Sequence, residues 1–420
     1  MDGKLPILLA VFLLTVAGCE LGSDNGKTVR VGAVYPLSGP QSSAGAEVQQ
    51  GIELALDIIN RPHPQLDLPL AAQRGLPALG GTRVEVIYAD HQSTAQLARE
   101  QTARLIEEER AVALLGAYES EQTRIASEVA EGFAIPFVNA TSTSPALTER
   151  GFQWFFRTTP ADTTFVNNAL QFIRELNTER GAGLQRLAVI HEGSAFGTGV
   201  RDLVASRAPE YGMEVVASVE TEGAATSVPA EVTQVREAQP DAVLFAVYAE
   251  EAIPFMQEFK AQDYAPPLIW ADDAGFISPE FLQTLGADAE YVTSREVWSV
   301  DLTLTNPLAA EVNALYRERY GVDLGGNSAR SFIGMMTLAE AINRAGSTEP
   351  TAVRDALRAT DIPADQLIVP WQGIGFDQTG QNTLGDGVVV QRLNGRYRTV
   401  WPNAIAVEPL VFPLPDWGAR

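Results

Sequence analysis

Residues 111–127 read AVALLGAYESEQTRIAS and join an apolar run to a polar run with helical periodicity. The apolar part, residues 111–118, is typical of a buried β-strand. After it, apolar side chains recur on one face of an α-helix, at Ile125, Ala126, Val129, Ala130 and Phe133. We therefore expect a strand that runs directly into a helix, with Ser120 at the turn between them.

The same alternation of strand and helix extends along the chain on both sides of this segment. Further strands are predicted at residues 29–35, 83–90, 135–141, 186–193, 213–219 and 242–248. Helical patterns lie between them, for example around Phe165 to Leu176 and from about Gly197. Repeated units of this length predict parallel sheets with helices on both faces, and two such sheets fit the length of the chain.

Two local features refine this pattern. Residues 61–81 carry four prolines and are predicted to form an exposed insertion before the next strand. Ser93 precedes a helical pattern over residues 93–110, so we expect its side chain to cap that helix.

Length and charge restrict the class of protein. A chain of 420 residues that is 45% hydrophobic exceeds the usual size of one domain, so two domains are expected. Its net charge of −23 repels phosphate backbones and anionic membrane surfaces, which argues against a nucleic-acid partner.

The N-terminus has the pattern of an export signal. Residues 1–18 contain a lysine, an apolar run and small residues, and the run is too short for a comfortable membrane span. Residues 16–19, VAGC, resemble a bacterial lipobox, so Cys19 is the expected lipidation site. The alternative is a plain signal peptide with an incidental cysteine. Cys19 is the only cysteine, which excludes an intrachain disulfide. The polar, glycine-rich residues 19–28 are predicted to be a tether.

Candidate ligand-binding residues lie at the carboxyl ends of strands. Ligands of open parallel sheets collect outside the carboxyl ends of the strands, where loops and helix N-termini point. Ser120, Thr141, Tyr248 and Asp273 are at such positions.

Four collinear stretches, residues 36–60, 116–127, 135–151 and 373–382, resemble the leucine/isoleucine/valine-binding family of type I periplasmic binding proteins, the substrate receptors of ABC importers. The resemblance implies two α/β lobes joined by three crossovers, which close on a ligand like a hinge. It implies lobe boundaries at residues 29–159 with 297–383 and at residues 160–296 with 384–420. It also implies a small-molecule ligand, ABC permease partners and no cofactor.

In that family, hydroxyl groups after the third and fourth strands hold the α-carboxylate of an amino acid. The matching residues are Ser120, Thr141, Ser142 and Thr143. Helix electrostatics support a carboxylate at this position, because a helix N-terminus offers unpaired N–H groups and a dipole that favours an anion. The alternative is that Ser120 only caps its helix.

The family's ammonium site uses a tyrosine and an acidic residue, which correspond to Tyr248 and Asp273, with Asp272 as the neighbouring alternative. A buried ammonium needs a compensating negative charge. The alternative is that both aspartates form a polar turn. Phe196 matches an aromatic position at the border of the cleft.

The sequence also departs from the family pattern. Ala44 or a neighbouring serine occupies a position that is often aromatic, so Tyr118 or Trp270 is the candidate replacement. Glu119 and Glu121 would oppose a bound carboxylate, so we expect both to face solvent.

No catalytic or metal-binding pattern is found. His63, His91 and His191 lie far apart without metal-ligand spacing, and no serine or cysteine nucleophile motif is present. Trp154, Trp270 and Trp298 are interpreted mainly as core or hinge packing. The sequence therefore predicts an exported binding protein for a small amino acid, most simply a branched-chain one. The alternative is a sensing receptor of the same fold for an amide, urea or an aromatic acid.

Overall fold

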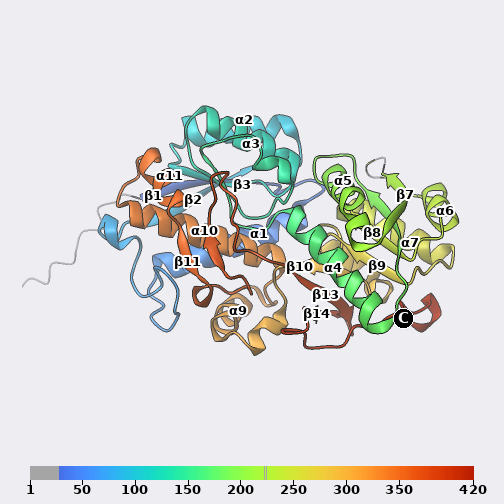
Figure 1. The fold of residues 1–420 in the computed structure, drawn as a ribbon. Coiled ribbons are helices and arrows are strands. Elements are labelled where there is room, and N and C mark those ends of the chain that lie inside the picture. Colours follow the sequence, from blue (N-terminus) through green and yellow to red (C-terminus); the bar gives the residue numbers. More distant parts are fainter. Residues whose placement is uncertain (1–27, 222, 224) are drawn as a thin grey trace, which may run out of the picture.

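The computed structural model describes residues 28–221, 223 and 225–420 (Figure 1). The predicted signal peptide, the predicted lipidation site Cys19 and most of the predicted tether lie outside the described residues. Thr28, the last residue assigned to the tether, already belongs to the first strand.

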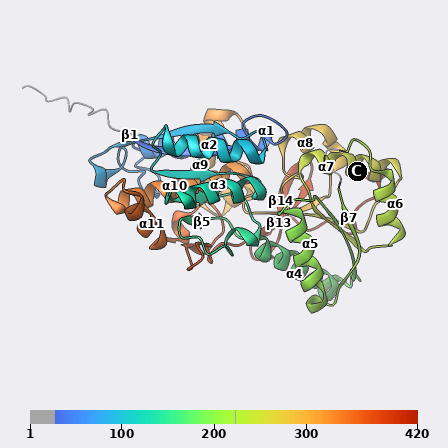
Figure 2. The same cartoon turned by 90° about the horizontal axis from the view of Figure 1, so that it is seen from above.

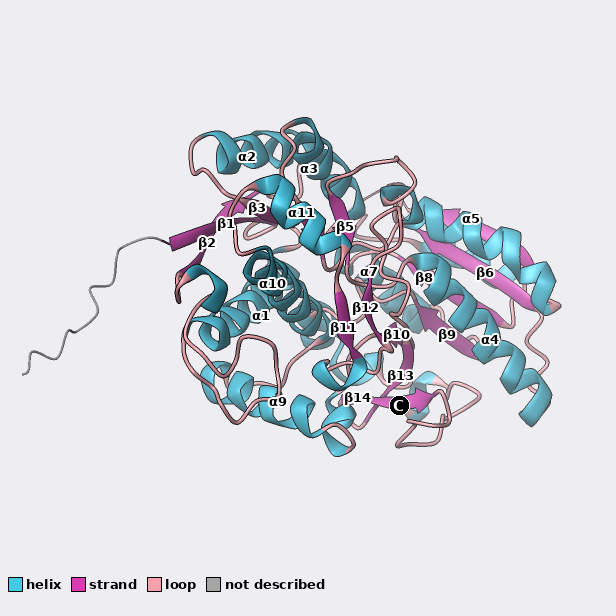
Figure 3. Ribbon diagram, turned by 60° about the vertical axis from the view of Figure 1, so that its left-hand side comes forward, coloured by secondary structure: helices cyan, strands magenta, loops and turns pink. Residues whose placement is uncertain are grey.

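The first lobe is built on a five-stranded parallel sheet with strand order β2-β1-β3-β4-β5. The strands are β1 (Thr28–Tyr35), β2 (Arg83–Asp90), β3 (Ala113–Gly116), β4 (Phe137–Asn139) and β5 (Phe155–Arg157). On one face pack α2 (Ala95–Glu107) and α3 (Ser120–Gly132), and on the other α1 (Ser42–Asn60) and α10 (Gly326–Ala345), as Figure 3 shows. The lobe also contains α9 (Pro307–Tyr320), α11 (Pro350–Arg358) and the short antiparallel pair β11 (Asp361–Pro363) and β12 (Gly373–Gly375).

The second lobe contains a seven-stranded sheet with order β14-β13-β10-β9-β8-β6-β7. The strands are β6 (Arg186–His191), β7 (Glu214–Glu220), β8 (Ala242–Ala246), β9 (Leu268–Ala271), β10 (Thr293–Glu296), β13 (Val388–Leu393) and β14 (Arg396–Trp401). One face is covered by α4 (Asp162–Arg180) and α5 (Gly197–Arg207), and the other by α6 (Pro229–Glu237), α7 (Ala249–Ala261) and α8 (Pro279–Leu285) (Figure 2). Strands β13 and β14 are antiparallel, so this sheet is mixed and not wholly parallel as predicted.

Seven short 3-10 helices complete the elements found in the described residues. They are η1 (Pro77–Leu79), η2 (Pro145–Leu147), η3 (Ala208–Tyr211), η4 (Gly286–Ala289), η5 (Val300–Leu304), η6 (Ala364–Gln366) and η7 (Trp417–Ala419). The chain passes between the lobes three times, after β5, after β10 and after β12. This confirms the predicted class, a two-lobed α/β fold with three crossovers.

Close helix packing places the N-terminus of α10 beside the gap between the lobes. Gly51 of α1 faces the backbone of α10, and a Cβ at this position would overlap the carbonyl oxygen of Ser328. The absence of a side chain at Gly51 therefore allows the two helices to approach closely, which fixes the position of residues early in α10.

Two local predictions are wrong. The N-cap of α2 is Thr94 and not Ser93, because Leu97 N donates to Thr94 Oγ1 at 3.4 Å. The proline-rich segment is only partly exposed, since Leu66, Ala71 and Leu76 are buried in the core of the first lobe. Among the described residues, no helix has the length and apolar character that a membrane crossing requires.

Candidate functional site

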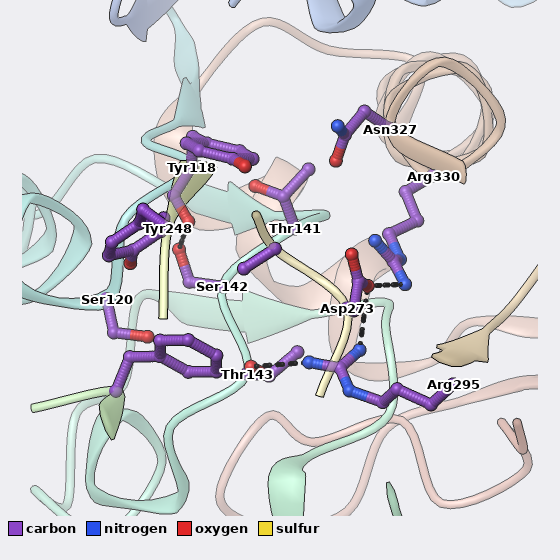
Figure 4. Close-up of a pocket in the computed structure, with 12 residues that line it drawn as sticks. Tyr118, Ser120, Thr141, Ser142, Thr143, Tyr248, Asp273, Arg295, Asn327 and Arg330 are labelled. Atoms are coloured by element: carbon purple, nitrogen blue, oxygen red, sulfur yellow. Dashed lines mark hydrogen bonds and ion pairs between the residues drawn. The ribbon is translucent and has the colours of Figure 1, made fainter. Parts of the chain in front are cut away.

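A cavity of about 310 Å³, measured with its open mouth, lies between the lobes. It is lined by Tyr118, Ser120, Thr141, Ser142, Thr143, Phe196, Tyr248, Asp273, Ala274, Arg295, Asn327 and Arg330. Figure 4 shows the rings of Tyr118 and Tyr248 on one side and the guanidinium groups of Arg295 and Arg330 on the other. Eight of the nine predicted binding residues are among these side chains, and the ninth, Asp272, lies behind Arg295.

Helix α3 presents its N-terminus at this cavity. The helix begins at Ser120, and its first backbone hydrogen bond runs from Thr123 N to Glu119 O, so the N–H groups before it have no partner within the helix. Ser120 is the first helical residue and not the N-cap. Its Oγ accepts a long hydrogen bond of 3.4 Å from Ser144 N. The alternative in which Ser120 only caps its helix is therefore wrong.

The turn after β4 supplies the hydroxyl groups. Asn139 Oδ1 accepts hydrogen bonds from Thr141 N and Ser142 N at 3.0 and 2.9 Å, which fixes the turn. Ser142 Oγ donates to Tyr118 O at 2.7 Å and lies 2.5 Å from Thr123 Oγ1, so this hydroxyl is already engaged. Thr141 Oγ1 is buried and has no hydrogen-bond partner among the described residues.

A buried cluster of charges lies opposite these hydroxyl groups. Arg295 Nη1 donates to Asp273 Oδ2 at 2.9 Å, and Arg295 Nε donates to Asp272 Oδ1 at 2.6 Å. Arg295 Nη2 lies 3.4 Å from both Asp162 Oδ1 and Thr143 Oγ1. Arg330 Nη2 pairs with Asp273 Oδ2. Asp272 and Asp273 are therefore held by buried ion pairs, and the alternative of a simple polar turn is wrong.

Burial sets the ionisation of this cluster. It raises the pKa of Asp162 to about 7, with the charge of Asp272 adding to the effect, and it raises the pKa of Glu296 to about 7. Burial also raises the pKa of Asp272. Burial alone would lower the pKa of Arg295, but the charges of the three aspartates raise it, so the guanidinium group stays protonated.

Aromatic rings from both lobes form the other side of the cavity. The ring centroids of Tyr118 and Tyr248 are 6.2 Å apart, and those of Phe196 and Tyr248 are 5.5 Å apart. Of the two candidates for the missing aromatic, Tyr118 lines the cavity, whereas Trp270 is buried against Phe172 in the core of the second lobe.

The backbone at two lining residues is unusual. Tyr118 and Asp273 have positive φ angles of 83° and 64°, a region that side chains other than glycine seldom adopt. Such conformations cost free energy and cluster at ligand-binding positions. Both residues lie two positions beyond the carboxyl end of a strand, where binding loops of α/β sheets are found.

The prediction that both glutamates face solvent is wrong for Glu119. Its side chain is buried, with the residue 5% exposed, and burial raises its pKa to about 7. As the N-cap residue of α3 it lies beneath the helix N-terminus. Glu121 is partly exposed and pairs with Arg124 at 2.6 Å.

Four lining residues were not predicted from the sequence: Ala274, Arg295, Asn327 and Arg330. For two of these residues the sequence offers a clue to a buried polar site. Arg295 lies in the short polar strand β10 between the buried residues Val292 and Val297, and Arg330 lies in the largely buried helix α10. A charged residue in such a place is rarely buried without a partner. Ala274 and Asn327 carry no comparable signal.

Comparison with known proteins agrees with this fold. The periplasmic binding protein family model matches residues 28–396. A relative from Brucella abortus called Leu/Ile/Val-binding protein homolog 7 is 26% identical over 408 residues, which cover 95% of this chain and 98% of the relative. A second, Leu/Ile/Val-binding protein homolog 8 from the same organism, is 25% identical over 394 residues, covering 91% and 93%.

Solved structures show the same two-lobed arrangement. The leucine-binding protein LivK from Thermotoga maritima has a TM-score of 0.76 at 22% identity, covering 89% of this chain and 97% of that one. The branched-chain amino acid transporter substrate-binding protein LivJ from Streptococcus pneumoniae, solved with isoleucine, has a TM-score of 0.73 at 21% identity, covering 90% and 100%. Proteins of this family bind solutes and are not enzymes. The chain belongs to the periplasmic binding protein family.

Proposed function

We propose that this protein is the extracytoplasmic receptor of an ABC importer and that it binds a small amino acid between its lobes. The observation that carries the proposal is the pairing of a helix N-terminus and hydroxyl groups on one wall with a buried carboxylate on the other. An amino acid presents a carboxylate and an ammonium group, which need these two surroundings.

The α-carboxylate would lie at the N-terminus of α3, with hydrogen bonds from the hydroxyl groups of Ser120 and Thr141. Thr143 stands beside them, and Ser142 supports the turn through its engaged hydroxyl. Each charge-assisted hydrogen bond to the carboxylate contributes roughly 1.5 to 3 kcal/mol.

The ammonium group would lie against Asp273, with Tyr248 and Phe196 closing the cavity from the second lobe. Asp273 is 4% exposed and belongs to the lining, whereas Asp272 is held behind it by Arg295. The two lobes would comprise residues 29–159 with 297–383 and residues 160–296 with 384–420, and closure between them would trap the ligand.

Export, a lipid anchor at Cys19 and delivery of the ligand to ABC permease subunits complete the proposal. The signal-peptide and lipobox patterns at the N-terminus and the family membership support these steps. The names of the relatives make leucine, isoleucine and valine the first ligands to test.

A thermal-shift and calorimetric screen of the purified chain tests the proposal. A ligand at about a hundred times its dissociation constant stabilises the folded protein by roughly 2.7 kcal/mol. The proposal expects such a shift with at least one amino acid. It is overturned if no amino acid binds, and the alternative ligands, namely amides, urea and aromatic acids, are included in the same screen.

A further inference from the structure

We propose that the ligand carries a second anionic group and that Arg330 binds it. The ligand class would then be short molecules with two carboxylates, which means acidic amino acids or dicarboxylic acids, and not aliphatic amino acids. This inference rests on the proposed function and names the ligand class of the same cavity.

Arg330 has donors that the protein itself does not use. Its side chain is buried, with the residue 2% exposed, and the hydrogen bonds found for its guanidinium group all run through Nη2, to Asp273 and Glu296. Its Nε is buried and has no partner among the described residues. A buried unsatisfied donor is costly, more so in a charged group. Because Arg330 lines the cavity, a ligand acceptor can satisfy these donors.

Thr141 supplies a second unused polar atom on the same cavity. Its Oγ1 is buried without a partner in the described part of the chain. In Figure 4, Thr141 lies between Tyr118 and Arg330. Two residues on different elements of the first lobe therefore line one cavity and each carry a buried polar atom without a partner, which favours a ligand with several acceptor oxygens.

The composition of the lining argues against an aliphatic side chain. Of the twelve lining residues, only Phe196 and Ala274 have no polar atom in their side chains. A branched aliphatic group would gain little apolar contact on the side of the arginines and would leave the free donors of Arg330 unsatisfied.

Net charge does not decide the ligand class, because the two guanidinium groups already have counter-charges. Asp273 pairs with both Arg295 and Arg330, and Asp272 lies 2.6 Å from Arg295. Asp162 and Glu296, whose pKa burial raises to about 7, lie 3.4 Å from Arg295 and Arg330, respectively. The preference for a second ligand carboxylate therefore rests on the unsatisfied polar atoms of Arg330 and Thr141.

Calorimetry of the full chain with a matched set of ligands tests the inference. The set is L-glutamate, L-aspartate, succinate and glutarate, compared with L-glutamine and L-leucine. Glutamine matches glutamate in size but lacks the second charge. We expect at least one dicarboxylate ligand to bind at least tenfold more tightly than both glutamine and leucine. Binding of glutamate but not glutarate would identify acidic amino acids as the ligand class. Binding of glutarate but not glutamate would identify dicarboxylic acids.

A variant tests whether Arg330 causes the preference for a dicarboxylate ligand. Arg330→Gln should abolish the preference for glutamate over glutamine, whereas Arg317→Gln, which removes an exposed arginine of α9, should leave it unchanged. The comparison of ligands on the unaltered protein decides the question even if Arg330→Gln does not fold.

The outcomes separate this inference from the proposed function. If leucine or glutamine binds as tightly as glutamate or more so, the inference is overturned and the receptor function stands. If only dicarboxylic acids bind, the inference stands and the amino-acid part of the function fails. If no ligand of either set binds, both are overturned.

Discussion

Arg330 and Asp273 form an ion pair across the cavity, and each residue comes from a different lobe. Arg330 lies on α10 beside the first sheet, and Asp273 follows β9 of the second sheet. Asp273 also pairs with Arg295 at 2.9 Å. One carboxylate therefore links the lobes, pairs with two buried cations and faces the ligand cavity.

Asp273→Asn should weaken amino-acid binding and reduce stability. The amide cannot balance a ligand ammonium, so we expect the dissociation constant to rise by more than tenfold. Removing one partner from a buried ion pair costs about 3 to 5 kcal/mol of unfolding free energy. Calorimetry and urea unfolding measure the two effects. Asp288→Asn, which breaks an exposed pair with Lys260, is the control and should change both by little. An unaltered dissociation constant would remove Asp273 from the site.

Ser120→Ala should weaken every ligand that carries a carboxylate, because its hydroxyl lies at the N-terminus of α3 beside the cavity. Loss of one charge-assisted hydrogen bond, roughly 1.5 to 3 kcal/mol, corresponds to a rise of about tenfold or more in the dissociation constant. The exposed Ser206 serves as the control, since Ser206→Ala should leave binding unchanged. Equal affinities of the two variants, measured by calorimetry, would show that the α3 hydroxyl does not hold the ligand.

Glu119→Gln should reduce the pH dependence of stability. Burial raises the pKa of Glu119 from 4.5 to about 7, so the folded state favours the protonated carboxyl group. The stability of the folded state that depends on this protonated carboxyl group is fully present below about pH 4.5 and is lost as the pH rises to about 7. The change is on the order of 3 kcal/mol, since one pKa unit corresponds to about 1.4 kcal/mol.

Urea unfolding at pH 5 and pH 8 measures this change for both proteins. The Gln variant should lose less stability between the two pH values and should be the more stable protein at pH 8. Glu121→Gln, at a partly exposed position of the same helix, is the control. If the free energy of unfolding changed by the same amount between pH 5 and pH 8 in the Glu119 variant and the unaltered protein, the buried Glu119 would not be protonated in the folded state.

The sequence predicted the alternation of strands and helices because burial in a parallel sheet requires long apolar runs. It also placed Ser120, Thr141, Tyr248 and Asp273 correctly at strand ends, since parallel strands share one carboxyl edge. It did not predict that Arg330 would reach Asp273, because that contact depends on the packing of α10 against the first sheet and on the relation of the two lobes.

The error at Glu119 has a similar cause. A glutamate beside a predicted carboxylate site was expected in solvent, because a second negative charge opposes an anion. In the structure the residue before α3 is covered by neighbouring elements, and His91 Nε2 lies 3.7 Å from Glu119 Oε2. A raised pKa removes much of the opposition, since a protonated carboxyl group is neutral. A sequence pattern predicts whether a whole face of a helix is exposed. It does not predict the exposure of a single residue at the end of a helix.

Gly326→Ala tests how tightly the cluster around Arg330 is packed. Gly326 is the first residue of α10, and a Cβ there would overlap the carboxylate of Glu296. That carboxylate accepts a hydrogen bond from Val297 N at 2.7 Å and lies 3.4 Å from Arg330 Nη2. In a helix without such contacts, alanine is more favourable than glycine by about 1 kcal/mol. Any loss of stability must therefore come from the displaced carboxylate.

We expect Gly326→Ala to lower the unfolding free energy by about 1 to 3 kcal/mol, the usual cost of overpacking, and to weaken ligand binding by moving a counter-charge of Arg330. Gly132→Ala is the matched control, because Gly132 ends α3 and a Cβ there meets no atom within 4 Å. That variant should be as stable as the unaltered protein or slightly more so. Urea unfolding and calorimetry of both variants measure the difference. If the two variants behaved alike, Glu296 would have room to move, and its contact with Arg330 would not restrict the shape of the cavity.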